Sequence, residues 1–247
     1  TDAGPVIDEE AAEGIRSCVA KARKEGRVLK ELDAPAPGHF VAPALLRVPG
    51  IKAMEREIFG PVLHVATFDS EELDRVIADI NATGYGLTFG LMTRIDDRVQ
   101  HVTDAVHAGN IYVNRNQIGA IVGSQPFGGE GLSGTGPKAG GPNYLSRFRA
   151  PEAGATAGDW QGGDSPERLA KALSGTPGAR VSQHDMPGPT GEANRLRLVQ
   201  RAPLLCLGPG KEAAAAQVAA VEALGGQAVA AEGAVSAETL AGLEGLS

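Results

Sequence analysis

Residues 125–136 read Gln-Pro-Phe-Gly-Gly-Glu-Gly-Leu-Ser-Gly-Thr-Gly, and this glycine-rich stretch is the strongest guide to the fold. Seven of the fourteen residues from Gly128 to Gly141 are glycine, a residue that lets a backbone approach a ligand or another segment closely. A flexible linker has a similar composition, but Phe127 and Leu132 interrupt the tract with side chains that pack. No Gly-x-x-x-x-Gly-Lys-Ser/Thr pattern occurs, which excludes a nucleotide P-loop. The stretch therefore predicts an ordered loop of a folded domain.

Strand-like and helix-like patterns alternate before this loop. Asp8 is placed to cap a helix that runs to about Gly26 and carries apolar residues on one face. Further helices are expected from Asp69 and over residues 96–107. Strands are expected at 62–68, 88–93 and 110–114. Alternating strands and helices predict an α/β layer with parallel pairing.

Four blocks of sequence, taken in order, resemble the aldehyde dehydrogenase superfamily. They are Glu-Ile-Phe-Gly-Pro-Val at 57–62, Tyr-Gly-Leu at 85–87, Ala-Gly-Asn-Ile-Tyr-Val-Asn at 108–114, and the glycine-rich stretch itself. The resemblance implies an α/β fold that is the C-terminal part of an aldehyde dehydrogenase catalytic domain, an open and mostly parallel sheet with helices. It also implies NAD as cofactor.

Two flanking segments are similar to a narrower group, the glutamate-semialdehyde (pyrroline-5-carboxylate) dehydrogenases. They are Gly-Ala-Ile-Val-Gly at 119–123 and Pro-Lys-Ala-Gly-Gly-Pro at 137–142. Residues 185–194, Asp-Met-Pro-Gly-Pro-Thr-Gly-Glu-Ala-Asn, resemble a segment of the bifunctional proline utilization A family of bacteria. That likeness implies oxidation of L-glutamate γ-semialdehyde to glutamate with NAD. It also implies an FAD-dependent proline dehydrogenase module elsewhere in the intact protein.

Composition changes along the chain suggest three regions. Residues 1–150 are expected to be the C-terminal part of the catalytic domain, and residues 151–194 a Gly/Pro-rich linker or an oligomerisation excursion. Residues 195–247 look like the start of a second α/β domain, a non-catalytic aldehyde-dehydrogenase-like one that stops at Ser247. Within it, Gly208-x-Gly210-x-x-Ala213 mimics a dinucleotide fingerprint, but an intervening proline favours a plain strand–turn–helix.

The resemblance assigns cofactor and substrate contacts to five residues. A carboxylate at Glu57 suits the paired hydroxyls of a ribose, and Phe59 is expected to pack near the nicotinamide ribose. Gly119 and Ala120 are expected to bind the substrate's distal carboxylate through backbone N–H groups, with Phe127 against its aliphatic chain. The alternatives are an exposed glutamate, an ordinary turn and core phenylalanines. Lys138 is expected to be structural or solvated.

The chain contains no expected nucleophile. Cys18 lies on the apolar face of a helix and Cys206 in an apolar run, where burial raises a thiol's pKa and keeps it unreactive. In the superfamily the nucleophilic cysteine and the general-base glutamate lie upstream of the motif that corresponds to Gly4–Asp8. The chain is therefore expected to be an internal piece of a longer protein and inactive alone. The five histidines have no metal-ligand spacing.

Net charge and composition indicate which classes of binding partner and which cellular location to expect. The formal net charge is −7 at pH 7, which argues against general nucleic-acid binding, so DNA is a partner only if the parent carries an N-terminal DNA-binding domain. No signal peptide or membrane span is predicted. A small-molecule substrate, a homo-oligomeric intact protein and a bacterial cytoplasmic location are expected. The alternatives are a stand-alone dehydrogenase for this or another small aldehyde, and a non-catalytic scaffold.

Overall fold

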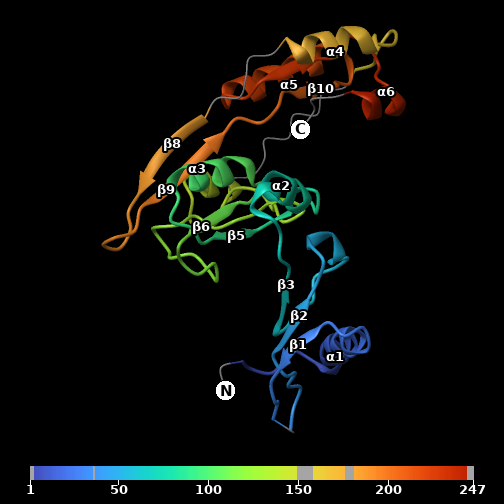
Figure 1. The fold of residues 1–247 in the computed structure, drawn as a ribbon. Helices are drawn as coiled ribbons and strands as arrows, with labels where there is room; N and C mark the ends of the chain where they lie inside the picture. Colours follow the sequence, from blue (N-terminus) through green and yellow to red (C-terminus); the bar gives the residue numbers. More distant parts are fainter. Residues whose placement is uncertain (1–2, 36, 149–157, 176–180, 244–247) are drawn as a thin grey trace. The chain divides into compact units, whose positions relative to one another are not determined.

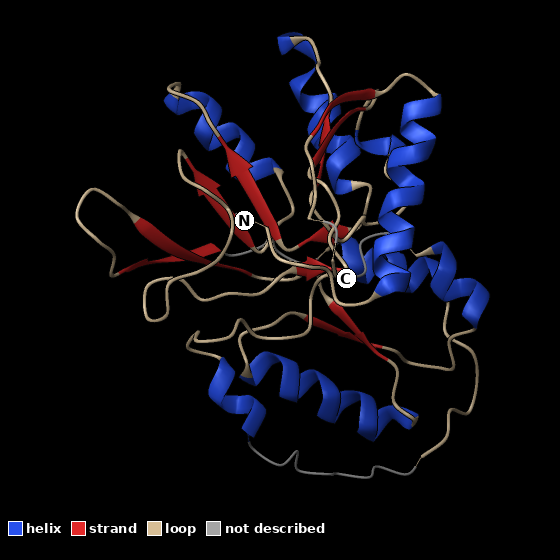
Figure 2. Ribbon diagram, turned by 90° about the horizontal axis from the view of Figure 1, so that it is seen from below, coloured by secondary structure: helices blue, strands red, loops and turns tan. Residues whose placement is uncertain are grey.

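The computed structural model describes residues 3–35, 37–148, 158–175 and 181–243 (Figure 1). The chain divides into two compact units. Unit 1 comprises Thr1–Gly119 and Phe127–Lys138, and unit 2 comprises Ala120–Pro126 and Ala139–Ser247. Figure 2 shows that long loops connect the short helices and strands.

Unit 1 begins with a helix packed on a small sheet. Helix α1 (Glu9–Lys24) starts where predicted, because the Asp8 side chain accepts a hydrogen bond from the Ala11 N–H at 2.8 Å. Strands β1 (Val28–Glu31), β2 (Ala44–Arg47) and β3 (Val62–Val65) form a sheet in the order β1-β2-β3. The β2–β3 pair is parallel as expected, whereas β1 is antiparallel to β2. The buried residues between helix and sheet are Val19, Ala22, Ala44 and Leu46.

The second part of unit 1 alternates helices and strands. After the short helix η2 (Ser70–Glu72) come α2 (Leu73–Asn81), β4 (Tyr85–Gly86), β5 (Thr88–Leu91), α3 (Asp96–Ala105) and β6 (Asn110–Val113). Strands β5 and β6 are parallel, and Ile77, Val102 and Val106 form the buried cluster beside them. The predicted helices and strands are thus present, with ends that differ by a few residues.

From Phe127 onward the glycine-rich stretch belongs to unit 1. It contributes β7 (Glu130–Gly131), which pairs antiparallel with β4. Ser133 Oγ also accepts a hydrogen bond from the Gly86 N–H at 3.2 Å. The stretch is therefore an ordered part of the unit and not a linker, as its packing residues predicted.

Unit 2 contains a second parallel strand pair with its own helices. Strand β10 (Leu204–Cys206), helix α5 (Gly210–Ala223) and strand β11 (Ala228–Ala230) follow one another, and β10 and β11 are parallel. Two more helices, α4 (Pro166–Ser174) and α6 (Ala237–Gly242), and the short helix η3 (Tyr144–Phe148) belong to the same unit. The predicted strand–turn–helix is confirmed, and β11 follows it.

A β-hairpin that the sequence did not predict lies in unit 2. Strands β8 (Val181–Met186) and β9 (Asn194–Val199) pair antiparallel over their full length. Strand β8 falls inside the region expected to be linker, and the hairpin crosses its expected boundary at residue 194. The parts of that region at 151–157 and 176–180 lie outside the described residues. In the described part of the chain, no helix has both the length and the apolar character that a bilayer crossing needs.

Candidate functional site

Glu57 and Phe59 lie on the loop between the short helix η1 (Ile51–Ala53) and β3. The residues that alternate with them hold this loop against α1. Ile58 packs on the buried cluster that includes Ile15, and a Cβ at Gly60 would lie 2.4 Å from Ile15 Cδ1. Ile58 is half-buried in this way, whereas Glu57 and Phe59 on either side of it are exposed.

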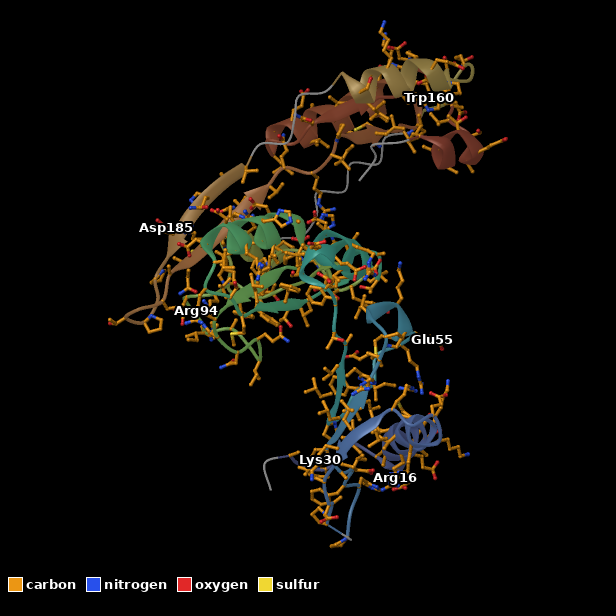
Figure 3. The ribbon with its side chains drawn as sticks, in the orientation of Figure 1. Arg16, Lys30, Glu55, Arg94, Trp160 and Asp185 are labelled. Atoms are coloured by element: carbon orange, nitrogen blue, oxygen red, sulfur yellow. The ribbon has the colours of Figure 1, made fainter. Side chains whose placement is uncertain are left out.

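The exposed Glu57 carboxylate fits the cofactor-binding role expected of it. Among the described residues it has no hydrogen-bond or ion-pair partner, so both oxygens can accept hydrogen bonds from ribose hydroxyls. Phe59 is 83% exposed, which is high for an aromatic side chain that a folded protein usually buries at least in part. Glu55, labelled in Figure 3, lies on the same loop two residues earlier.

Gly119 and Ala120 follow β6 on a loop and are both half-buried. The division between the units falls between them. Their backbone N–H groups have no hydrogen-bond partner within the described residues, which is uncommon for half-buried backbone. A Cβ added at Gly119 meets nothing within 4 Å, so the packing of this chain does not require glycine there. Successive backbone N–H groups of this kind can bind an anion.

The Gln125 side chain fixes the part of this loop that belongs to unit 2. Its Oε1 accepts a hydrogen bond from the Ile121 N–H at 3.1 Å. Its Nε2 donates to Glu192 Oε1 at 2.7 Å and to Asn194 Oδ1 at 2.9 Å. The loop is thereby tied to the start of β9, in the segment whose sequence resembled the proline utilization A family. Gln125 belongs to the glycine-rich stretch at 125–136, but its residue type alone did not indicate this role.

Phe127 is half-buried and belongs to unit 1. The next residue is tied to β6, because the Gly128 N–H donates to Asn110 Oδ1 at 3.1 Å. The two backbones approach so closely that a Cβ at Gly109 would lie 1.8 Å from Gly128 O. Only glycine fits at Gly109, which explains its place in the 108–114 block. No hydrogen bond or ion pair of the described residues joins Phe127 to Glu57 or Phe59.

The structure assigns the Lys138 side chain to a structural role. Its side chain is not solvated as one alternative had it: the residue is half-buried, and Nζ donates hydrogen bonds to Gly109 O, Gly128 O and Asn110 Oδ1. Burial lowers the pKa of the Lys138 ammonium, and the Glu130 carboxylate acts in the opposite direction. The nearby Tyr112 is 4% exposed, and burial raises the pKa of its hydroxyl.

Neither cysteine has the surroundings of a nucleophile. Cys206 is 5% exposed on β10, and burial raises the pKa of its thiol. Cys18 is half-buried on α1 and packs against the cluster formed by Val19, Ala22, Ala44 and Leu46. Apolar surroundings of this kind do not activate a thiol as a nucleophile.

The Gly208–Gly210 turn of unit 2 is filled by protein. A Cβ at Gly158 would lie 2.8 Å from Pro209 O, and one at Gly210 would lie 3.3 Å from Asp159 N. The Trp160 indole N–H donates to Leu207 O at 2.8 Å. The backbone at Gly158 and Asp159 therefore lies against the turn that would bind a pyrophosphate in a dinucleotide fingerprint. Among the residues described, no group of three or more His, Cys, Asp or Glu side chains is placed to hold a metal ion.

Comparison with known proteins gives this geometry a context. Residues 1–152 match the aldehyde dehydrogenase family. The chain is 41% identical over 261 residues to the bifunctional protein PutA of Klebsiella aerogenes, an alignment that covers 91% of this chain and 20% of that protein. The chain therefore spans about a fifth of the length of the curated relatives it matches first.

Two solved structures show the same fold. A mutant of Bradyrhizobium japonicum proline utilization A (PutA) is 53% identical, with a TM-score of 0.55 over 59% of this chain and 15% of that one. The 1-pyrroline-5-carboxylate dehydrogenase from Thermus, solved with bound NAD, is 35% identical, with a TM-score of 0.53 over 59% of this chain and 28% of that one. The expected α/β fold is thereby confirmed.

Proposed function

This chain belongs to the aldehyde dehydrogenase family, and on that premise we propose that it forms the C-terminal part of an NAD-dependent L-glutamate γ-semialdehyde dehydrogenase. We place this module in a bifunctional protein that also carries an FAD-dependent proline dehydrogenase module. The observation that carries the proposal is the 41% identity to a bifunctional PutA across 91% of the chain. That alignment extends well beyond residues 1–152, the part shared with aldehyde dehydrogenases in general.

The exposed loop before β3 is the proposed cofactor contact of this chain. The free Glu57 carboxylate accepts hydrogen bonds from the ribose hydroxyls of NAD, and Phe59 covers the apolar side of the nicotinamide ribose. NAD, when bound, accepts the hydride that leaves the substrate carbon. The contact of Ile58 with the cluster around Ile15 anchors this loop and leaves Glu57 and Phe59 exposed for the cofactor.

The loop at Gly119 and Ala120 is the proposed specificity element. Glutamate semialdehyde carries a carboxylate far from its reacting carbon, and the two free N–H groups of this loop suit that anion. Hydrogen bonds to a charged group contribute about 1.5–3 kcal/mol each. Phe127 contacts the aliphatic part of the same substrate. The nucleophile and the general base come from outside this chain, so we expect the 247 residues alone to be inactive.

The proposed division of labour follows the regions found in the sequence. Residues 1–150 belong to the catalytic domain, residues 151–194 connect it or support a homo-oligomer, and residues 195–247 begin a second domain without chemistry. A bacterial cytoplasmic location suits this activity. DNA binding is proposed only if the parent protein carries an N-terminal DNA-binding domain.

The rival function is a scaffold that does no chemistry. The close approach of the Gly158–Asp159 backbone to the Gly208–Gly210 turn favours it for the part of the chain from Gly208 onward, because it crowds the turn that would bind a pyrophosphate. The donors at Gly119 and Ala120 argue against it for the rest, because a scaffold has no need of backbone N–H groups that can bind an anion.

Substrate selectivity tests the proposal. In the longer protein that carries this chain, Gly119→Val should raise the KM for glutamate semialdehyde by about tenfold or more, the equivalent of one hydrogen bond to a charged group. The KM for propanal, which has no carboxylate, should change far less. Gly162→Val is the matched control, because Gly162 also has open space at its Cβ position. NADH absorbance follows both reactions.

The outcomes separate three explanations. An equal rise in KM for both aldehydes indicates collapse of the loop and not loss of carboxylate recognition. An unchanged KM for both removes the semialdehyde assignment in favour of a general aldehyde dehydrogenase. A wild-type protein that forms no NADH from either aldehyde supports the scaffold.

A further inference from the structure

Three oxygen atoms of unit 1 converge on one ammonium group. Lys138 Nζ donates to Gly128 O at 2.6 Å, to Asn110 Oδ1 at 3.2 Å and to Gly109 O. Two of these oxygens are backbone carbonyls from segments that run side by side. Carbonyl dipoles that point at the same spot repel each other unless a positive charge stands between them.

The number of N–H donors on the Lys138 ammonium equals the number of acceptor oxygens around it. A lysine has three N–H donors and no acceptor, and here there are three acceptors for them. Asn110 Oδ1 also accepts from the Gly128 N–H at 3.1 Å, so Asn110 and Lys138 hold Gly128 from both sides. The peptide groups before and after Gly128 are both fixed in this way.

We propose that Lys138 is a positioning residue that fixes Phe127 for its contact with the aliphatic chain of the aldehyde. The inference rests on the proposed function, which gives Phe127 that contact. Phe127 immediately precedes Gly128, so a shift of the Gly128 backbone moves the attachment point of the ring. Lys138 itself touches neither substrate nor cofactor, and it acts through the Gly128 carbonyl.

Backbone groups must fix the loop at Gly128, because this residue has no side chain that could pack. Gly128 and Gly129 have no side chains to pack, and each glycine leaves the backbone free to adopt many conformations. The close approach of Gly109 to Gly128 O sets the distance between the segments. The Lys138 ammonium makes that approach electrostatically favourable.

The test compares three variants in the longer enzyme. Lys138→Met keeps the length of the side chain and removes the charge, Lys138→Arg keeps the charge in a bulkier group, and Lys30→Met repeats the first change at an exposed lysine (labelled in Figure 3). Lys138→Met should raise the KM for glutamate semialdehyde about tenfold or more and leave the KM for NAD within about twofold. Lys138→Arg should give a smaller rise in the KM for the semialdehyde, because the guanidinium pushes the two carbonyls apart. Lys30→Met should match the wild type.

Kinetic outcomes decide the proposal in each case. Folded Lys138→Met with an unchanged KM for the semialdehyde overturns it, and so does an equal rise in the KM for NAD, which indicates a general structural role. If Lys138→Met does not fold, Lys138→Arg decides: an unchanged KM for the semialdehyde then refutes the role in positioning.

Hydrogen exchange separates this inference from the proposed function. The Gly128 amide should exchange faster in Lys138→Met than in the wild type or Lys30→Met, because the hydrogen bond from Lys138 no longer holds the Gly128 carbonyl in place. A wild-type enzyme that fails to oxidise glutamate semialdehyde refutes the proposed function, while unchanged exchange at Gly128 refutes the fixation by Lys138.

Discussion

The Asp164–Arg168 pair of unit 2 should determine much of that unit's stability at neutral pH. The Asp164 side chain is only 2% exposed. It accepts two hydrogen bonds from Arg168, through Nε at 2.7 Å and through Nη2. It also accepts the Glu232 N–H at 2.7 Å, and Arg168 Nη2 reaches Ala230 O at 3.1 Å. The pair thus joins the start of α4 to the segment after β11.

We expect Asp164→Asn to lower the free energy of unfolding of unit 2 by about 3 kcal/mol, the low end of the range for removing one partner of a buried pair, because the Arg168 side chain is 30% exposed. An asparagine keeps one acceptor oxygen but turns an N–H group toward an Arg168 donor. For a chain of this size the melting temperature should fall by roughly 6–12 °C. Asp185→Asn is the control, because Asp185 is 85% exposed and lies 3.8 Å from Arg195, so its loss should cost less than about 1 kcal/mol.

The fluorescence of Trp160 is a direct assay. Trp160 is the chain's single tryptophan and lies in unit 2 (labelled in Figure 3). Its indole N–H donates to Leu207 O, so unfolding of unit 2 should change its emission. If Asp164→Asn and Asp185→Asn unfold at the same melting temperature at pH 7, the Asp164–Arg168 pair does not stabilise unit 2 as we propose.

The effect should also depend on pH with a definite sign. The Arg168 guanidinium holds the pKa of Asp164 below its usual value, so the pair contributes stability that is fully present above the unfolded pKa of about 3.9. This stability is lost as pH falls through the lowered pKa of the folded state. The difference between wild type and Asp164→Asn should therefore be constant from pH 7 to about pH 5 and shrink below about pH 4. A difference that persists unchanged in stronger acid contradicts the electrostatic origin.

Two further predictions concern the proposed enzyme. Glu57→Ala should weaken NAD binding by about 1.5–3 kcal/mol without unfolding the protein, whereas Glu55→Ala on the same loop should not; equal NAD titrations for both would remove Glu57 from the site. Replacing Cys18 and Cys206 together with Ala should leave turnover nearly intact, with a loss of stability of about 1–2 kcal/mol from lost packing. A folded but inactive double variant would show that the nucleophile lies within this chain.

The sequence predicted best those elements whose cause is local. Helix α1 was predicted from a cap at Asp8 and an apolar face, and the structure buries Ala12, Ile15, Val19 and Ala22 on that face. Strand β6 likewise follows from a short apolar run after a glycine. In both, neighbouring residues determine the conformation, so a single sequence is enough.

Elements held by distant partners were missed for an equally physical reason. Strand β8 is exposed along most of its length, so no alternation of apolar and polar residues indicated it, and its pairing with β9 supplies its order. The two-residue strands β4 and β7 exist only because Gly86 and Glu130 meet. The antiparallel direction of β1 depends in the same way on its place beside β2.

The candidate site shows the same distinction on a smaller scale. Glu57 was identified because a short motif surrounds it, and its exposure follows locally from Ile58, the next residue, which packs on the cluster around Ile15. The roles of Gln125 and Lys138 were not identified, because their side chains form hydrogen bonds with backbone atoms or with residues that are distant in sequence. Two of the three acceptors of Lys138 are carbonyl oxygens, which every residue has and no residue type reveals.

The glycine at 109 and the lysine at 138 are nevertheless consequences of one arrangement. Gly109 is required because Gly128 O occupies the place of its Cβ, and that approach brings the two carbonyl oxygens toward a common point. Convergent oxygens need a cation, and the chain supplies one ten residues after Gly128. The glycine at 109 makes the close approach to Gly128 O sterically possible, and the Lys138 ammonium offsets the repulsion between the two carbonyl oxygens. The glycine and the lysine are therefore required together.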